Sequence, residues 1–135
     1  MQNKPCFLQH HDTATLIFAN PTPAHFVAAA LGLPTLTVIL NNRMWAAVRR
    51  ATLSLYPGGA AAESNRAALT YLEPAPDYEM IVRASGGYGE RVERVEDLPA
   101  AFARGLHAIE AEKRPAVLNV LTEYSDSDAV ADAKR

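Results

Sequence analysis

The amino-acid sequence predicts an α/β fold in three layers: a doubly wound, mainly parallel sheet with helices on both faces. From residue 14 onward, short strand-like segments alternate with helix-like segments, which is the pattern of βαβ units. The apolar and β-branched run at residues 36–40 has the character of a parallel strand buried on both faces. The 135 residues, 49% of them hydrophobic, are enough for one compact domain. We expect this domain at residues 15–124, between an irregular segment at residues 1–14 and a polar tail at residues 125–135.

The first predicted strand and helix lie ahead of a glycine. Residues 15–18 are short and apolar and are expected to form a strand. Thr22 can cap the following helix, and Pro23 suits its first turn because the N–H that proline lacks has no partner there. The helix is expected over residues 23–31 and ends at Gly32, which readily adopts a left-handed backbone. Four apolar residues of this helix are expected to face the sheet: Phe26, Val27, Ala30 and Leu31.

A second strand and helix follow. The strand at residues 36–40 ends at two asparagines, and the next helix is expected over residues 45–53. The sequence Tyr-Pro-Gly-Gly at residues 56–59 has strong turn chemistry and ends that helix. Residues 57–66 are therefore expected to form a surface loop.

The alternation continues in the second half of the chain. A helix near Tyr78 is expected to stop at Gly86-Gly87, and a polar strand is expected at residues 89–95. Glu96-Asp97 can cap a longer helix with apolar residues at helical spacing, namely Leu98, Phe102, Leu106 and Ile109. Pro115 stops this helix, and residues 116–121 are expected to form the last strand.

Charge and cysteine content exclude several classes of protein. Thirteen Lys and Arg against fifteen Asp and Glu give a net charge of −2, which favours neither nucleic acid nor an anionic membrane surface as partner. The single cysteine, Cys6, cannot form an internal disulfide, so we expect a reducing compartment, the cytoplasm. The sequence shows neither a signal peptide nor an apolar run of the roughly 20 residues that a membrane helix needs.

The most informative polar residues are Asn41 and Asn42, which follow the strand at residues 36–40. Ligands of open α/β sheets bind at the carboxyl ends of the strands. An amide oxygen is a neutral hard ligand that suits Mg²⁺ when a carboxylate and phosphates supply the negative charge. The alternative interpretation is structural, an Asx-turn that leads the chain out of the strand.

These asparagines and their surroundings resemble a known family. The sequences at residues 36–50 and 20–26 are similar to the C-terminal cofactor-binding domain of thiamine diphosphate-dependent enzymes, the acetolactate synthase and benzoylformate decarboxylase group. The resemblance continues through residues 77–95 and 115–123, so it covers roughly residues 15–124. It implies an incomplete domain of this kind, with thiamine diphosphate and Mg²⁺ as cofactors.

The resemblance also implies roles for single residues. Asn42 would bind Mg²⁺ through its side chain, and Met44 through its backbone carbonyl. The remaining cofactor-binding residues implied around them are Asn41, Trp45, Ala46 and Ala47. No residue of this chain is expected to be catalytic.

The sequence departs from the family at the expected position of a Gly-Asp-Gly motif. Counting back from Asn42 leads to Asp12-Thr13-Ala14-Thr15, which contains neither glycine. Such glycines let a backbone approach a diphosphate, and the carboxylate between them supplies charge for Mg²⁺. Asp12 is the candidate for that third metal ligand after a shift in register. Without the motif, weak or no binding of thiamine diphosphate is expected.

Two functions from different classes remain open, beside a third and weaker interpretation as an unrelated small flavodoxin-like or nucleotide-binding domain. The first is the thiamine diphosphate-binding domain of a 2-keto acid decarboxylase or carboligase, inactive alone because family members use a glutamate from a separate pyrimidine-binding domain. The simplest account under this hypothesis is a C-terminal piece of such an enzyme, with a pyrimidine-domain chain as a partner. The second is a degenerate, non-catalytic interaction module that has lost the cofactor. Under both hypotheses we expect a homo-oligomer. Apolar helix and sheet surfaces that neighbouring domains cover in the larger enzymes would be exposed in this chain, and such surfaces favour association.

Three other motifs are expected to be structural. Adjacent side chains in His10-His11-Asp12 seldom converge on one metal ion. The glycine-rich residues 85–89 follow a helix instead of preceding one, which favours a helix cap and turn over a phosphate loop. His25 and His107 are expected at helix surfaces. Three arginines beside the proposed site could attract phosphates or a carboxylate, although exposed arginines on a helix more often only interact with solvent: Arg43, Arg49 and Arg50.

Overall fold

The computed structural model describes residues 6–10, 21–64 and 70–123. The chain divides into two compact units, which we call the sheet unit (residues 1–41 and 77–121) and the turn unit (residues 42–76 and 122–135). The predicted α/β fold class is confirmed, and the sheet with its helices lies in the sheet unit. Within the described residues, no helix combines the length and the apolar character needed to cross a bilayer.

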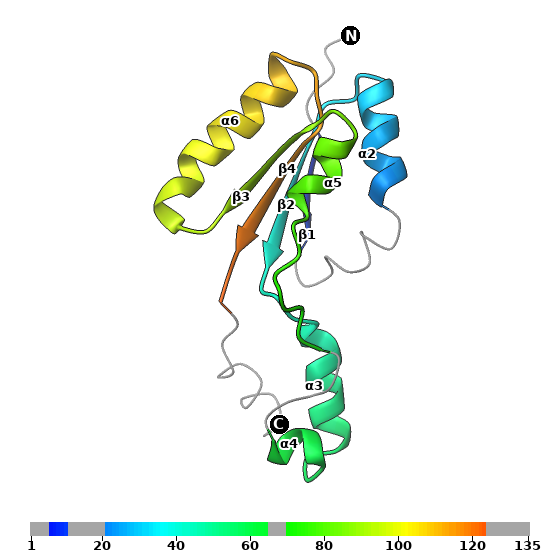
Figure 1. The fold of residues 1–135 in the computed structure, drawn as a ribbon, viewed down its shortest axis with the longest axis vertical. Coiled ribbons are helices and arrows are strands. Elements are labelled where there is room, and N and C mark those ends of the chain that lie inside the picture. Colours follow the sequence, from blue (N-terminus) through cyan, green and yellow to red (C-terminus); the bar gives the residue numbers. More distant parts are fainter. Residues whose placement is uncertain (1–5, 11–20, 65–69, 124–135) are drawn as a thin grey trace. The chain divides into compact units, whose positions relative to one another are not determined.

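One parallel sheet forms the centre of the sheet unit (Figure 1). Its strands are β1 (Cys6–His10), β2 (Thr35–Asn41), β3 (Tyr88–Val92) and β4 (Ala116–Leu121), arranged in the order β1-β2-β4-β3. Each neighbouring pair is parallel, so all carboxyl ends lie at one edge. The register pairs Asn41 with Leu121, and Asn119 lies between Ile39 and Arg91.

Strand β1 falls in the segment that the sequence analysis expects to be irregular. Its five residues pair with β2 from Cys6 opposite Thr35 to His10 opposite Ile39. The local sequence gives little strand signal, because such a short segment becomes a strand through pairing with a distant partner. The strand expected at residues 15–18 lies outside the described residues.

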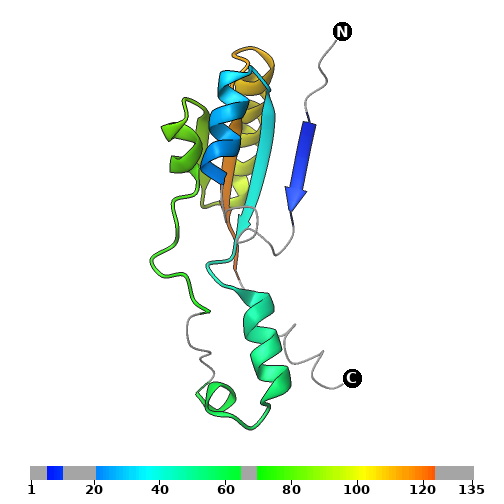
Figure 2. The same ribbon diagram turned by 90° about the vertical axis from the view of Figure 1, so that its right-hand side faces the viewer.

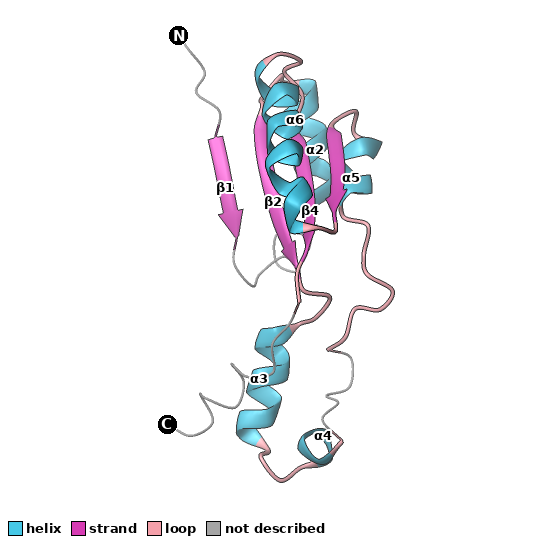
Figure 3. Cartoon of the chain, turned by 90° about the vertical axis from the view of Figure 1, so that its left-hand side faces the viewer, coloured by secondary structure: helices cyan, strands magenta, loops and turns pink. Residues whose placement is uncertain are grey.

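Helices cover both faces of the sheet (Figures 2 and 3). Helix α6 (Leu98–Glu110) lies on one face, and α2 (Pro21–Ala30) and α5 (Glu79–Ala84) lie side by side on the other. The main core lies under α6, and its fully buried residues come from three strands and the helix: Leu36, Val92, Ala101, Ala108, Ile109, Ala116 and Leu118. On the α5 face, a smaller core contains Ile39, Val82 and Val117.

Helix α2 ends as predicted but presents a different face. Gly32 has φ 61°, and the Leu33 N–H donates to the Ala28 carbonyl oxygen at 2.8 Å, which closes the helix. The predicted sheet-facing residues Phe26 and Leu31 are instead 63% and 67% exposed. His25 and Ala28 are the buried residues, so His25 is also more buried than predicted. The reason is that the helix contains no acidic or basic residue in its first or last turn and is apolar around much of its circumference, so periodicity cannot select a face.

Helix α5 lies very close to β3. The carboxyl end of α5 is closed by Gly86, at φ 79°, and by Gly87, whose N–H donates to the Val82 carbonyl oxygen at 2.9 Å. Residues 85–87 therefore form the predicted cap and turn, whereas Tyr88 and Gly89 already belong to β3. A Cβ atom at Gly89 would lie 2.2 Å from the Glu79 carbonyl oxygen, so only glycine permits this approach. The Arg83 guanidinium fixes it further by donating to the Gly89 carbonyl oxygen at 2.9 and 2.6 Å.

Helix α6 follows a short 3₁₀ turn, η1 (Val95–Asp97), and is tied to β3 by a polar contact. Arg104 on α6 donates to both carboxylate oxygens of Glu90, at 2.5 and 3.1 Å, and the Tyr88 hydroxyl donates to the same carboxylate. The last strand, β4, has the predicted bounds.

The turn unit consists mainly of helix α3 (Ala46–Leu55) and the single turn α4 (Ala60–Glu63). The predicted second helix is confirmed, whereas the loop expected at residues 57–66 contains α4. The Gly59 backbone precedes α4, and its carbonyl oxygen accepts from the Ala62 and Glu63 N–H groups. Three alanines in this stretch favour the helical turn over an open loop.

Candidate functional site

Asn41 is the last residue of β2, at the edge of the sheet where strands β1 to β4 end. Its side chain points to the α5 face and is only 3% exposed. The Asn41 Nδ2 donates to the Asn119 Oδ1 at 3.1 Å, and the Asn119 Nδ2 donates to the Glu79 Oε2 at 2.6 Å. The first asparagine of the pair is therefore held within the sheet unit by a buried hydrogen-bonded chain.

Asn42 begins the turn unit and forms a tight local turn. Its Oδ1 accepts a hydrogen bond from the Met44 backbone N–H at 3.1 Å. This is the Asx-turn that the structural interpretation predicts. An amide oxygen has two lone pairs, so this hydrogen bond fixes the oxygen in place and leaves it able to accept a second partner.

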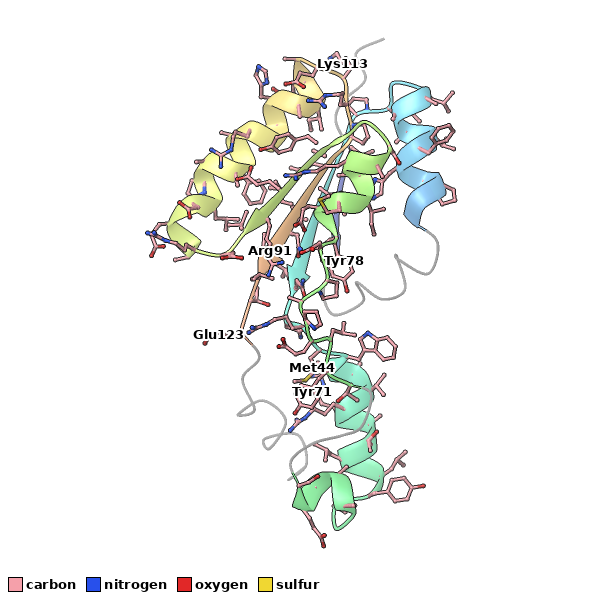
Figure 4. All side chains as sticks on the ribbon, viewed as in Figure 1. Met44, Tyr71, Tyr78, Arg91, Lys113 and Glu123 are labelled. Carbon is pink, nitrogen blue, oxygen red and sulfur yellow. The ribbon has the colours of Figure 1, made fainter. Side chains whose placement is uncertain are left out.

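Met44 is also fixed from its other side. It forms an antiparallel bridge with Tyr71, flanked by hydrogen bonds from the Trp45 N–H to the Thr70 carbonyl oxygen and from the Leu72 N–H to the Arg43 carbonyl oxygen, both 2.8 Å. Figure 4 shows Met44 and Tyr71 beside each other at the start of α3. In such a bridge the N–H and carbonyl of the central residue point away from the partner strand. The Met44 carbonyl oxygen is thus directed to the same side as the Asn42 Oδ1.

The other predicted cofactor-binding residues lie at the beginning of α3. Trp45 occupies the position before the helix and is 38% exposed, Ala46 is buried, and Ala47 is exposed. The structure therefore brings Asn42, Met44 and Trp45 into one turn, whereas the side chain of Ala47 projects from the helix surface.

Whether these groups fit a divalent cation depends on the donor set. Asn42 supplies an amide oxygen and Met44 a carbonyl oxygen, which are hard neutral ligands of the kind that Mg²⁺ accepts. Among the described residues, no three His, Cys, Asp or Glu side chains are grouped closely enough to hold a metal ion. The predicted charged ligand, Asp12, lies outside the described residues. The turn thus fits the cation in part, with two oxygen ligands and no charge.

Charged residues also gather near the end of β3 in the sheet unit. Arg91, labelled in Figure 4, is within 2.7 Å of the Asp77 Oδ1 and within 3.0 Å of the Glu93 Oε1. Nearby, burial raises the pKa of the Tyr78 hydroxyl, which stays a neutral donor at neutral pH. On α2, burial lowers the pKa of His25, which favours its neutral form.

Among the buried polar residues whose burial the sequence does not predict are Arg49, Asn119 and Glu79. Arg49 on α3 is 2% exposed, although the sequence analysis expects it at a helix surface. Asn119 and Glu79 are 0% and 6% exposed. A signal for Asn119 exists in the sequence, because it is the single polar residue in the otherwise apolar run at residues 116–121.

Comparisons with known proteins found similar sequences. The family model described as "Thiamine pyrophosphate enzyme, C-terminal TPP binding domain" matches residues 18–120. Two similar relatives are a probable acetolactate synthase of Mycobacterium bovis and the acetolactate synthase large subunit IlvG of Mycobacterium tuberculosis. Each is 36% identical over 89 residues, which is 66% of this chain and 14% of the relative. The matched segment therefore spans a small part of either relative.

Proposed function

The chain belongs to the family of C-terminal TPP-binding domains of thiamine pyrophosphate enzymes, and from this premise we propose a more specific function. It is the thiamine diphosphate- and Mg²⁺-binding domain of an enzyme that decarboxylates 2-keto acids or joins them by carboligation. The similarity to two acetolactate synthases supports this reaction class. On its own, the chain binds the cofactor weakly and does not turn over substrate.

The observation that carries the proposal is the turn from Asn42 to Met44. The Met44 N–H holds the Asn42 Oδ1 at 3.1 Å, and the bridge to Tyr71 directs the Met44 carbonyl to the same side. Two oxygens are therefore oriented before any cation arrives, which lowers the entropic cost of binding it. In this role Asn42 and Met44 bind Mg²⁺, and Asp12 provides the negative charge.

In this proposal, the remaining residues of the site contact the cofactor and shield it from water. Trp45 and Ala46 supply apolar surface at the start of α3, with Ala47 at its rim. When bound, thiamine diphosphate supplies an electron sink for cleavage beside a carbonyl carbon. We assign no proton transfer to a residue of the part that the structure describes, and we propose that a pyrimidine-binding domain supplies the group that transfers the proton.

Titration calorimetry with Mg²⁺ and thiamine diphosphate tests the proposal. We expect Mg²⁺-dependent binding that is weaker than the low micromolar range, about −8 kcal/mol, because the Gly-Asp-Gly motif is missing. Asn42→Ala should remove most of the binding, whereas the matched control Asn20→Ala should retain it. If millimolar cofactor gave no Mg²⁺-dependent heat, or if Asn42→Ala bound as well as the wild type, the proposal would be wrong.

One observation favours the second candidate function, a degenerate interaction module. Residues 12–15, Asp-Thr-Ala-Thr, carry neither of the glycines that the family places there. A chain of this kind would bind a protein partner and no cofactor. The same titration, combined with a search for a partner that binds through the helix at residues 46–55, separates the two candidates.

A further inference from the structure

Three buried polar side chains form a continuous hydrogen-bonded chain in the sheet unit. Glu79 is the first residue of α5, Asn119 lies in β4, and Asn41 ends β2. The Asn119 Nδ2 donates to Glu79 at 2.6 Å, and the Asn41 Nδ2 donates to Asn119 at 3.1 Å. Since burying a carboxylate costs free energy, a Glu79 that is 6% exposed calls for a physical reason.

The carboxylate of Glu79 determines which way the two amides of the hydrogen-bonded chain face. A carboxylate only accepts hydrogen bonds, so the NH₂ group of Asn119 must face Glu79. The oxygen of the Asn119 amide then faces Asn41, which in turn must present its own NH₂ group. As a result, the Asn41 Oδ1 is the atom that faces away from Asn119.

The position of Glu79 is fixed by its backbone as well as by its side chain. Because residue 89 is glycine, the first turn of α5 rests directly on β3, and a Cβ there would lie 2.2 Å from the Glu79 carbonyl oxygen. Arg83, one turn later on α5, donates two hydrogen bonds to the Gly89 carbonyl oxygen. The carboxylate is thus delivered to Asn119 by a rigid contact between helix and strand.

We propose that Glu79 is a positioning residue that acts through Asn119 to set the direction in which the Asn41 amide faces at the end of β2. The Asn41 oxygen then points away from Asn119, and any group that approaches this oxygen as a partner is a hydrogen-bond donor or a cation. This last step rests on the proposed function, extended to Asn41 as the family resemblance implies. The direction in which the amides face does not depend on the proposed function.

Moving the carboxylate from position 79 to position 41, the other end of the hydrogen-bonded chain, tests the direction in which the amides face. In Asn41→Asp, a carboxylate stands at each end of the Asn119 amide, so one of them must face its oxygen. In Glu79→Gln combined with Asn41→Asp, the Asn119 amide can reverse, donating to residue 41 and accepting from the NH₂ group introduced at position 79. The net charge of this double variant equals that of the wild type.

The measurement is the unfolding equilibrium constant of the full chain in urea for the wild type, both single variants and the double variant. We expect Asn41→Asp to unfold much more readily than the wild type. Adding Glu79→Gln should lower the unfolding equilibrium constant of Asn41→Asp at least tenfold. If Asn41→Asp does not fold, folding of the double variant is itself the rescue. Additive effects of the two substitutions, or a double variant that fails to fold, would overturn the proposal.

A matched control excludes a general effect of charge. Glu110 lies on the exposed surface of α6, away from Asn119 in the fold, and Glu110→Gln removes the same charge. Combined with Asn41→Asp, it should give no rescue. An equal rescue by Glu110→Gln would show that net charge, and not the direction of the amides, determines the stability.

Cofactor titration then tests the step that depends on the proposed function. The side chain introduced by Glu79→Gln can donate as well as accept, so it leaves the Asn41 amide without a fixed direction. We expect this variant to lower Mg²⁺-dependent thiamine diphosphate affinity several-fold, whereas Glu110→Gln does not. If the wild type binds no cofactor, the proposed function is wrong. The urea unfolding measurements on the four proteins still test the direction in which the amides face. If the wild type binds and Glu79→Gln binds equally well, the positioning role is wrong.

Discussion

Gly89 is the residue at which the sheet unit leaves no room for a side chain. A Cβ atom there would meet the Glu79 carbonyl oxygen at 2.2 Å, and this atom belongs to the backbone and cannot move aside as a side chain would. We expect Gly89→Ala to lower the free energy of unfolding by about 1–3 kcal/mol, the usual cost of overpacking.

Urea denaturation measures this loss, and Gly58→Ala is the matched control. No atom lies within 4 Å of a Cβ built at Gly58, so that variant should stay within about 0.5 kcal/mol of the wild type. Equal stability of the two variants would mean that α5 does not rest on β3 as described.

Single residues also show how far the sequence alone leads. Asn41 and Asn42 stand out in the sequence because a polar pair after an apolar strand is a local signal, whereas Met44 is implied only by the family resemblance. The structure places Asn42 and Met44 in one turn. Their role as metal ligands stays a prediction. The burial of Arg49 was not predictable, because a basic residue on a helix is most often solvated, and only tertiary packing makes this one 2% exposed.

At the scale of elements, local signals predicted some boundaries well and failed elsewhere for physical reasons. Helix α2 ends at the predicted glycine because a left-handed residue is a local property of the chain. Its buried face depends on packing beside α5, and β1 exists through pairing with β2, which are both long-range effects. The fold class was predictable because alternating strands and helices repeat along the whole domain.

The contact between α6 and β3 makes the stability of the fold depend on pH through Glu90. Hydrogen bonds from Arg104, together with one from the Tyr88 hydroxyl, lower the pKa of Glu90 despite the opposing effect of burial. A carboxyl whose pKa is lower in the folded state stabilises the fold above its ordinary pKa, about 4.3. That contribution is lost as the pH falls through the folded-state value.

Arg104→Gln should therefore reduce stability at pH 7 and flatten its decline below about pH 4.3. The effect should be small, because Arg104 is 52% exposed and water screens the pair. Urea denaturation at a series of pH values measures the slope. Arg94→Gln, which breaks the more exposed pair with Glu96, is the control and should change the slope less. A steeper decline in Arg104→Gln would contradict the assignment.

For the molecule as a whole, we expect association between copies of the chain. Phe26 on α2 and Leu31 just after it are 63% and 67% exposed, and exposed apolar side chains of this kind favour association. Sedimentation at micromolar concentration should detect a dimer or larger species. Phe26→Ser with Leu31→Ser should shift it toward monomer, whereas Val95→Ser, at a residue that is 76% exposed, should not. A monomeric wild type, with no loss of stability on deletion of residues 1–11, would refute this expectation.

Restoring the family motif separates a damaged cofactor domain from an interaction module. In the triple variant Asp12→Gly, Thr13→Asp and Ala14→Gly, the carboxylate moves from position 12 to position 13 and gains a permissive glycine on each side. If the turn from Asn42 to Met44 still presents two oxygens, a carboxylate held between two glycines should raise Mg²⁺-dependent thiamine diphosphate affinity at least tenfold over that of the wild type, roughly 1.4 kcal/mol. The matched variant with Thr13→Asn keeps both glycines and should gain much less, because an amide supplies no charge. Turnover of pyruvate should stay undetectable in both, because the proposed reaction needs a pyrimidine-domain chain. If the triple variant gained no affinity while the wild type bound a protein through the helix at residues 46–55, the chain would be an interaction module.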